Sequence, residues 1–425
     1  MNLEYPHNPL LPDHVFVPDA EAHVWADGRL YLYGSFDMQG NRAYCSREYH
    51  VYSTDDLEHW TDHGVSFTLA DAAWYPTDKP GYHALYAPDC AYRNGVYYLY
   101  YCVPDGRCGV ASSSSPAGPF TDIGPIEGVM GIDPAVLIDD DGQAYLYWGQ
   151  FDNVRAAKLK DNMTEIEPDS VVQPLSVAEH DFHEGSSVKK IGGLYYFLYT
   201  DTHRHKDAKH PIGKATCLGY AVSDKPTSGF RYGGIIIDNE GCDPGTWNDH
   251  GSLCCFHGQW YVFYHRSTHG GEFSRHVCAE PVTIENGVIA EVPMTSSGAS
   301  PAIPASVSIR AAHACLLSGN VRIEGDEAED SRPLVLGQIR PGDSAVFRYL
   351  SFDGENRFSA DLRSDGSCEI SVYLDDICYG VTDGSGAASF AEELSGIHTL
   401  RLVFGGDFSD AQLRSFRFFL ESKEI

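Results

Sequence analysis

The chain has 425 residues, of which 43% are hydrophobic and 12% aromatic, enough for packed cores in two or three domains. Its formal net charge of −30 argues against nucleic acid and anionic membranes as partners. No apolar run approaches the roughly 18 residues of a membrane span, so we expect no membrane partner.

The N-terminus and the cysteines bear on the compartment. The stretch MNLEYPHNPLLPDH has neither a basic nor an apolar region, so it is not expected to be a signal peptide. The twelve cysteines are scattered, mostly within apolar strands, and include no CxxC pair. We therefore expect reduced, buried cysteines and a cytoplasmic location.

A turn glycine followed by an aromatic-rich strand recurs five times, in ADGRLYLYGS, RNGVYYLYYC, DDGQAYLYWG, IGGLYYFLYT and FHGQWYVFYH. Glycine accepts the positive φ of such turns, so each copy predicts a β-hairpin. Strand–loop–strand motifs at 51–64, 110–124 and 220–234 lie between the hairpins, and each is expected to supply the two outer strands of a blade. Imperfect all-strand repeats of about 50 residues are typical of propellers. The sequence thus predicts an all-β chain with a five-bladed β-propeller of four strands per blade.

The repeats place the propeller at residues 1–294, and the residue composition and strand pattern change after it. Residues 295–306, TSSGASPAIPAS, are small and polar and contain proline, so we expect a linker or transition over 295–320. From 321 to 425, short alternating strands such as DSAVFRYLSF and HTLRLVFGG predict a β-sandwich, jelly-roll-like domain.

Polar residues near the first strand of each blade are the candidates for chemistry, because these strands converge on the propeller axis. They are Asp19, Asp89, Asp133, Glu184 and His250. Any one of the aspartates alone is more often a turn or capping residue. A buried acid is costly unless it is paired or used, so the cluster predicts an active site.

The stretches that carry these residues resemble glycoside hydrolase family 43, whose members are five-bladed propeller glycosidases. The similar stretches are NPLLPDHVFVPDAEAHVWADGRLYLYGS, LYAPDCAYRNGVYYLYY, GIDPAVLIDDDGQAYLYWG, HEGSSVKKIGGLYYFLY and HGSLCCFHGQWYVFYHR, within about residues 5–282. The resemblance implies that Asp19 is the general base, that Asp133 modulates the pKa of the acid, and that Glu184 is the general acid. It also implies an axial position for His250, often beside a bound calcium ion or water.

The resemblance suggests substrate contacts as well. Arg275 is the candidate for an arginine that contacts the sugar, with Arg266 as the alternative. Further candidate contacts, each also compatible with a structural role, are Asp89, Trp74, Tyr86 and Phe36. The chain departs from the family pattern at Glu21, a rival base two residues after Asp19, and at Tyr86, where the family usually has tryptophan.

The residue types fit the chemistry of glycosidic cleavage. The family inverts the anomeric centre, so a water must fit between base and sugar, and the two carboxyls are expected roughly 6.5–9.5 Å apart. The base must be ionised to deprotonate that water, while the donor must still carry a proton near neutral pH.

The tail, about 321–425, resembles carbohydrate-binding module family 6. Related modules carry aromatic platforms and sometimes calcium, for which Glu324, Glu327 and Glu329 are the candidates here. The tail has no tryptophan and only three tyrosines, Tyr349, Tyr373 and Tyr379. A structural role, such as packing on the propeller or forming a homo-oligomer, is therefore an equal alternative to sugar binding.

We expect an inverting exo-glycoside hydrolase that releases terminal α-L-arabinofuranosyl or β-D-xylosyl residues from plant-cell-wall-derived oligosaccharides. The alternatives are an exo-galactosidase or galactofuranosidase of the same family, and a non-catalytic sugar-binding propeller. No cofactor is expected to be required, and a structural calcium ion stays open.

Overall fold

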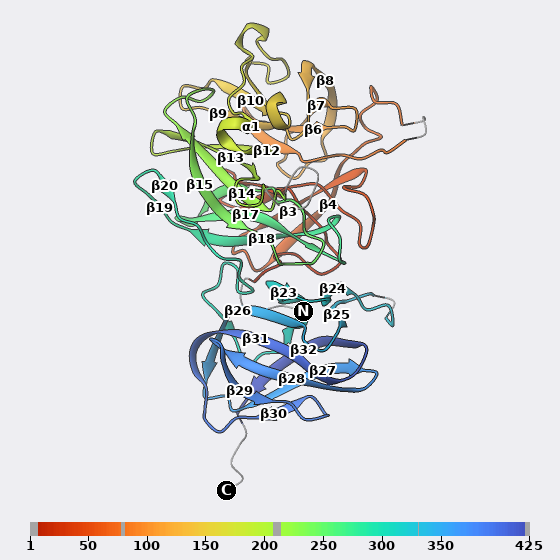
Figure 1. Cartoon of the computed structure of the whole chain (residues 1–425). Coiled ribbons are helices and arrows are strands. Elements are labelled where there is room, and N and C mark those ends of the chain that lie inside the picture. Colours follow the sequence, from red (N-terminus) through yellow and green to blue (C-terminus); the bar gives the residue numbers. More distant parts are fainter. Residues whose placement is uncertain (1–6, 78–80, 207–213, 330, 421–425) are drawn as a thin grey trace.

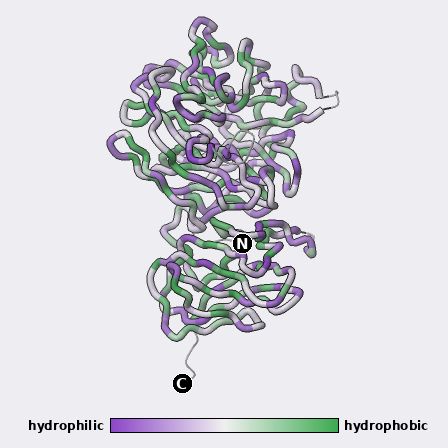
Figure 2. Tube along the Cα trace, in the orientation of Figure 1, coloured by the Kyte–Doolittle hydropathy of each residue, from purple (hydrophilic) through white to green (hydrophobic). Residues whose placement is uncertain are grey.

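The computed structural model describes residues 7–77, 81–206, 214–329 and 331–420, and its regular structure is almost entirely β-strand (Figure 1). The chain forms a five-bladed β-propeller, drawn in red to green, followed by a β-sandwich in blue. In both domains hydrophobic and hydrophilic stretches alternate along the chain (Figure 2). Within the described residues, no helix has the length and apolar character needed to cross a membrane.

Blades 1, 2 and 4 are four-stranded antiparallel sheets, whose strands follow one another from the axis outwards. Blade 1 contains β1 (Glu21–Val24), β2 (Leu30–Tyr33), β3 (Glu48–Thr54) and β4 (Trp60–Thr68). Blade 2 contains β5 (Asp89–Arg93), β6 (Val96–Cys102), β7 (Arg107–Ser113) and β8 (Thr121–Met130). Blade 4 contains β12 (Phe182–Ile191), β13 (Leu194–Asp201), β14 (Cys217–Ser223) and β15 (Arg231–Asp238).

Blades 3 and 5 have three-stranded sheets in the described chain, so the prediction of four strands in every blade is wrong. Blade 3 contains β9 (Ala135–Ile138), β10 (Ala144–Trp148) and β11 (Arg155–Leu159). Blade 5 contains β16 (Ser252–Phe256), β17 (Gln259–Thr268) and β18 (Ser274–Val282). Short elements follow or separate these strands: η1 (Phe151–Asn153), η2 (Pro168–Ser170), α1 (Val177–His180), β19 (Ile284–Glu285) and β20 (Val288–Ile289).

The outer strand is missing for a different reason in each of these two blades. Beyond β11 only the isolated bridges Leu159↔Ile166 and Ala156↔Val172 form, because η2 with its proline lies between them. Beside β18 lies the N-terminal segment, where the Leu10 amide donates to the Val277 carbonyl over 3.0 Å. The start of the propeller thereby docks on its last blade and closes the ring.

The aromatic strands are recognisable in the sequence because they are buried on both faces. Tyr100 packs between blades 2 and 3, whereas its neighbour Tyr101 packs between blades 1 and 2. Tyr147 and Leu146 divide in the same way between the two faces of blade 3. One apolar cluster fills each gap between neighbouring blades, including the gap between blades 5 and 1.

The stretch 295–320 is not a linker, and in this the domain prediction was wrong. Its short elements are β21 (Ile303–Pro304), β22 (Ile309–Arg310), η3 (Ala311–His313) and β23 (Leu316–Ser318), and the three strands pair with strands of the sandwich. Ile303 and Ile309 are buried in the sandwich core. The small, proline-containing composition concealed these apolar residues, whose burial depends on strands that come much later in the chain.

Two packed sheets make up the sandwich. The first contains β21, β23, β26 (Ser344–Asp353), β28 (Ser367–Leu374), β29 (Ile377–Val381) and β31 (Ser395–Asp407). The second contains β22, β24 (Arg322–Gly325), β25 (Leu334–Ile339), β27 (Arg357–Ser364), β30 (Ala387–Ser389) and β32 (Ala411–Phe419).

The two domains are in direct contact. Phe16 of the N-terminal segment is buried in the sandwich core. The His269 amide, at the β17–β18 turn, donates to the Ile323 carbonyl over 2.6 Å, and the Leu317 amide donates to the Gly241 carbonyl over 2.7 Å. The sandwich is therefore attached to the propeller at several points rather than hung on one connection.

Candidate active site

Asp19, Asp133 and Glu184 come together where the inner strands of blades 1, 3 and 4 begin. Asp19 and Asp133 each lie two residues before their strand, with φ of 58° and 56°. Few residues adopt this left-handed conformation, and aspartate is one that tolerates it. Such backbone angles are found at functional sites because surrounding structure enforces them.

The Asp19 carboxylate is held by cationic and polar groups. Its Oδ1 accepts from Nη1 of Arg275 over 2.8 Å, and its Oδ2 accepts from Oγ of Ser35 over 2.7 Å. The Nδ1 atoms of His265 and His250 lie 3.4 and 3.7 Å from Oδ1. Burial works against ionisation, but the Arg275 charge and the His265 contact outweigh it and hold the pKa of Asp19 below its ordinary value. Asp19 is thus an anion, as a general base must be.

Asp133 and Glu184 interact closely. The amide of Gly185, next to the acid, donates to Oδ2 of Asp133 over 3.0 Å. Burial, and then the charges of Glu184 and Asp19, raise the pKa of Asp133 well above its ordinary value. Asp133 is therefore held towards its protonated form, beside the backbone amide that follows Glu184.

Side-chain amides hold the Glu184 carboxyl group in place. Nε2 of Gln150 donates to its Oε2 over 2.5 Å, and Nδ2 of Asn248 donates to its Oε1 over 3.3 Å. Beside it, His183 makes edge contacts with the rings of Phe151 at 4.6 Å and Trp247 at 5.2 Å. The Glu184 side chain therefore has a fixed orientation next to aromatic rings.

The sequence model of the glycosyl hydrolases family 43 matches residues 6–289, which include all of these side chains. This chain belongs to that family. It is a glycoside hydrolase, and the family's enzymes work with inversion of the anomeric centre.

Relatives and solved structures agree with this assignment. A xylosidase/arabinosidase of Thermoclostridium stercorarium is 35% identical over 336 residues, which cover 68% of this chain and 67% of that protein. A family 43 β-xylosidase/α-arabinofuranosidase from a compost microbial metagenome, crystallised with xylotriose in a calcium-free form, is 30% identical, with a TM-score of 0.58 over 68% of this chain and 97% of that one. An arabinoxylan arabinofuranohydrolase from Bacillus subtilis covers 99% of both chains with a TM-score of 0.60; at 24% identity it shows the fold alone.

Arg275 in this family 43 enzyme lies beside Asp19. Its guanidinium is buried and, besides Asp19, binds Asp37 through Nε at 2.9 Å and Nη2 at 3.1 Å. The alternative, Arg266, is buried elsewhere: it bonds to Tyr264 and pairs with Glu280 at 3.3 Å. Of the two candidates, Arg275 is the one that the fold brings to the carboxylates.

The candidate substrate contacts differ in where they lie. Tyr86 is close to the site, because Asp133 is among the acidic groups that, after burial, raise its pKa. Phe36 stacks on His50 at 4.5 Å and packs on the apolar cluster between blades 5 and 1. Ser35 and Asp37, its neighbours, face Asp19 and Arg275, so alternation along the chain turns Phe36 the other way.

Trp74 and Asp89 make structural contacts. Nε1 of Trp74 donates to the Tyr101 hydroxyl over 3.1 Å, and the Arg107 guanidinium lies 4.8 Å from the Trp74 ring centroid. Asp89 accepts from the amide of Val136 in blade 3 over 2.6 Å and so ties two blades together. Neither has a recorded contact with the three carboxylates among the described residues.

The site residues missed in the sequence include Asp37, Tyr44, Gln150 and Asn248, and also Ser35 and His265 beside Asp19. The Tyr44 ring lies 4.8 Å from the Arg275 guanidinium, and its buried hydroxyl has no hydrogen-bond partner among the described residues. Burial and the charges of Glu184 and Asp19 raise its pKa. Gln150 follows a predicted hairpin and Asn248 precedes His250, so position near the axis was an available signal; Asp37 and Tyr44 lie in a loop and gave none.

The rival base, Glu21, is the first residue of β1 and has different partners. Its Oε2 accepts from Nζ of Lys189 over 3.0 Å and lies 3.9 Å from Nε2 of His23. It has no recorded contact with Arg275 in the described chain. Glu21 therefore belongs to a second polar cluster on the inner strands.

A calcium ion beside His250 does not fit this chain well. Calcium takes six to eight oxygen ligands, preferably with carboxylates among them. The charges of Asp19, Glu184 and Glu21 act on His250, and two of these carboxylates are already paired with a side-chain cation, Asp19 with Arg275 and Glu21 with Lys189. A bound cation at this position would face two positive side chains.

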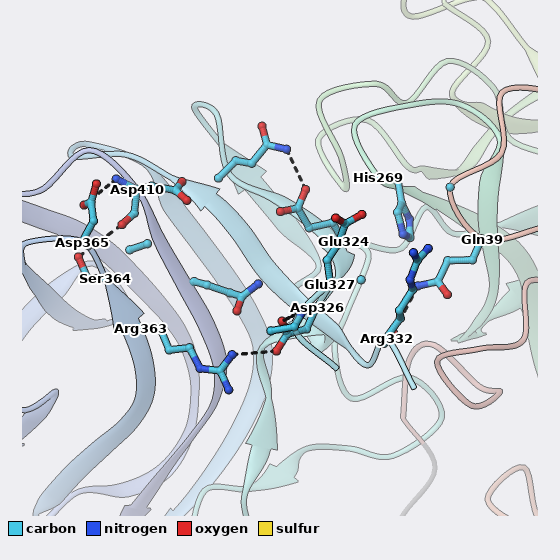
Figure 3. Close-up of a pocket in the computed structure, with 16 residues that line it drawn as sticks. Gln39, His269, Glu324, Asp326, Glu327, Arg332, Arg363, Ser364, Asp365 and Asp410 are labelled. Atoms are coloured by element: carbon cyan, nitrogen blue, oxygen red, sulfur yellow. Dashed lines mark hydrogen bonds and ion pairs between the residues drawn. The ribbon is translucent and has the colours of Figure 1, made fainter. Parts of the chain in front are cut away.

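The candidate calcium residues of the sandwich do not converge either. Glu324 and Glu327 line a groove of about 820 Å³ between the sandwich and the propeller loops at Gln39 and His269 (Figure 3). Glu324 accepts a hydrogen bond from Gln338 over 2.8 Å. Glu329 is paired instead with Arg414 at 2.5 Å.

Proposed function

We propose that this family 43 hydrolase releases terminal α-L-arabinofuranosyl or β-D-xylosyl residues, with inversion, from plant-cell-wall-derived oligosaccharides. The observation that carries the proposal is the division of charge in the site. Asp19 is an anion beside Arg275, whereas Asp133, which accepts from the amide next to Glu184, has a pKa well above its ordinary value. Pentose as the sugar is supported by the names of the similar proteins reported above.

The steps follow from this arrangement. Asp19 takes a proton from water, whose oxygen forms a bond to the anomeric carbon as the glycosidic bond breaks. Glu184 gives its proton to the departing glycosidic oxygen. Attack from the face opposite the leaving group inverts the configuration.

Exo action is supported by two long segments, 69–85 and 201–216, which we expect to wall the pocket. Tyr82 of the first segment packs against Tyr86, with ring centroids 6.3 Å apart. Leu85 is fixed to the loop at Ser46 by a backbone hydrogen bond of 2.8 Å. Residues 78–80, and 207–213 of the second expected wall, 201–216, lie outside the described residues.

The first experiment compares nitrophenyl α-L-arabinofuranoside, β-D-xyloside and the galactosides, alongside an arabinoxylo-oligosaccharide. The anomer released first is followed by NMR, with Glu184→Gln as the paired variant. Nitrophenolate needs little acid assistance, so the variant should lose far more rate on the oligosaccharide than on the nitrophenyl substrates. Inverted pentose from the end of the chain is the expected product.

Other results would favour the alternatives. Activity on galactosides alone would replace the pentosidase by an exo-galactosidase or galactofuranosidase. Binding of oligosaccharide with no hydrolysis of any substrate would favour a non-catalytic sugar-binding propeller. Rapid internal cleavage of polymeric arabinan would overturn the exo assignment.

A cytoplasmic location is a second proposal, supported by the cysteines. All twelve are free thiols and ten are buried, which suits a reducing compartment. Sugar binding by the sandwich and formation of a homo-oligomer are likewise kept as alternatives for the tail. Cell fractionation tests the location. Binding of the oligosaccharide to a Glu184→Gln protein, with and without substitutions in the sandwich, tests whether the sandwich binds sugar.

A further inference from the structure

The cluster around Glu21 is a buried polar group that the catalytic mechanism does not use. It joins three blades: Glu21 and His23 from β1, Asp89 from β5 and Lys189 from β12. We propose that Lys189 is the built-in cation of the propeller axis, whose ammonium group neutralises Glu21 and Asp89 beside the catalytic residues in place of a bound metal ion. The inference holds for either released sugar.

The geometry makes Lys189 the central partner of Glu21. Nζ lies 3.0 Å from Oε2 of Glu21, and 17% of the Lys189 side chain is exposed. Lys189 is the one hydrogen-bond donor recorded for this carboxylate in the described part of the chain, where Oε1 has no partner. Removing the ammonium group would leave a buried carboxylate with no hydrogen bond.

Asp89 adds a second negative charge to the same place. One oxygen atom of Glu21, one ring nitrogen of His23 and one oxygen of Asp89 all lie within 4.8 Å of one another. His23 Nε2 is 2.7 Å from Asp89 Oδ1. Burial alone would lower the pKa of Lys189, but the charges of Glu21 and Asp89 outweigh it and raise the pKa. The cluster therefore holds the ammonium group in its charged form.

Two acids and a histidine at this spacing are also a reasonable ligand set for a metal ion. The Lys189 ammonium already occupies the neighbourhood of the Glu21 oxygen, however, and would repel a second cation. The Lys189 side chain thus supplies the positive charge that a bound metal ion would otherwise supply to these ligands. Without Lys189, the same ligands should be able to bind a metal ion.

The cluster also bears on the catalytic residues above it. Glu21 is two residues from Asp19, and its charge acts on His250, whose Nδ1 is 3.7 Å from Asp19. By neutralising Glu21, Lys189 reduces the negative charge near Asp19, the proposed base, and Glu184, the proposed acid. Lys189 is in this sense a positioning residue and not a catalytic one.

The test measures the melting temperature of the full chain with EDTA, with calcium chloride, and with choline chloride at equal ionic strength. The variants are Lys189→Met, Lys189→Arg, Glu21→Gln and the double variant Glu21→Gln/Lys189→Met. Lys190→Met is the matched control, because Lys190 is the next residue, is 22% exposed and also pairs with carboxylates, at 2.5 Å and 2.9 Å.

In EDTA, Lys189→Met should lower the melting temperature by about 5 °C or more, whereas Lys190→Met should lower it by only about 1–2 °C. Lys189→Arg and the double variant should each recover part of the loss, the first by restoring the charge and the second by removing its partner. Calcium chloride, but not choline chloride, should raise the melting temperature of Lys189→Met more than that of the wild type.

Three results would overturn the proposal. The first is a loss in Lys189→Met no larger than that in Lys190→Met. The second is a double variant no more stable than Lys189→Met, which would mean that Lys189 acts by packing. The third is an equal rise with calcium in wild type and Lys189→Met, which would mean that the ammonium group does not stand in for a metal ion.

Discussion

Nη1 of Arg275 lies 2.8 Å from Oδ1 of Asp19, while the rest of the same guanidinium is bound to Asp37. The residue expected to contact the sugar is thus also the counter-charge of the expected base. Burial raises the pKa of Asp37 in spite of Arg275, whereas the pKa of Asp19 is held below its ordinary value, so the guanidinium serves chiefly as the counter-charge of Asp19. The arrangement keeps Asp19 ionised and fixes where it points.

The charge of Arg275 should therefore appear in the pH profile. In Arg275→Met, burial acts on Asp19 with less opposition, so the pKa of Asp19 rises. A base works only when ionised, so the acid limb of kcat/KM should move to higher pH, from below the ordinary pKa of 3.8 to above it. Kinetics between pH 3 and 8, with circular dichroism as a check on folding, measure the shift.

Arg266→Met is the matched control for that profile. Arg266 is equally buried and pairs with Glu280, so its loss should lower stability. It should not move the acid limb, because Arg266 has no contact with Asp19. Equal shifts in the two variants would show that the limb reports general loss of structure.

Substitution of each rival should identify the base. Asp19→Asn removes the carboxylate bound to Arg275 and should lower kcat by about 100- to 10,000-fold. Glu21→Gln should change kcat by less than about tenfold, because Glu21 is paired with Lys189 instead. Steady-state kinetics on an arabinoxylo-oligosaccharide decide between them, and the reverse order of losses would make Glu21 the base.

Gln150 should matter through the acid it holds. Gln150→Ala removes the 2.5 Å hydrogen bond to Glu184 and should lower kcat on the oligosaccharide by about 10- to 100-fold. The loss on nitrophenyl substrates should be smaller, since their leaving group needs little acid assistance. Gln143→Ala serves as control, because Gln143 binds only the Ala144 and Leu159 carbonyls. A uniform loss on both kinds of substrate would argue against a role in proton donation.

Asp201 should make stability depend on pH. It is buried in blade 4, where burial raises its pKa from 3.8 to about 6 in spite of hydrogen bonds from the His203 amide and the Tyr232 hydroxyl. Between these values the unfolded chain is ionised and the folded chain is protonated, so stability is lost as pH rises.

The isosteric Asp201→Asn variant isolates this effect. Relative to the variant, the wild type should lose about 2 kcal/mol of unfolding free energy between pH 4 and pH 7. Urea unfolding of both proteins at the two pH values measures the difference. A constant difference would mean that Asp201 titrates alike in the folded and unfolded states.

Local sequence patterns were sufficient to predict much of the fold. The turn glycines and aromatic strands predicted five blades, because strands buried on both faces leave runs such as YLYYC and AYLYW. Positions next to those strands placed Asp19, Asp133 and Glu184 near the axis. The fifth blade and the stretch 295–320 were mispredicted because their outcome depends on pairing with distant segments, Leu10 with Val277 and Ile303 with Leu350. In the third blade, the short helix η2 with its proline interrupts the outer strand instead.

The sequence by itself determined the blade repeat, the two-domain order and the three acids, since each is encoded within a few neighbouring residues. Only the tertiary structure decided how those acids differ. It placed Arg275 on Asp19 from 256 residues away, Gln150 on Glu184 across a blade gap, and Lys189 on Glu21 from the far side of the ring. Charge interactions and hydrogen bonds act over a few ångströms, and the distance between two residues along the chain does not show whether folding brings them that close.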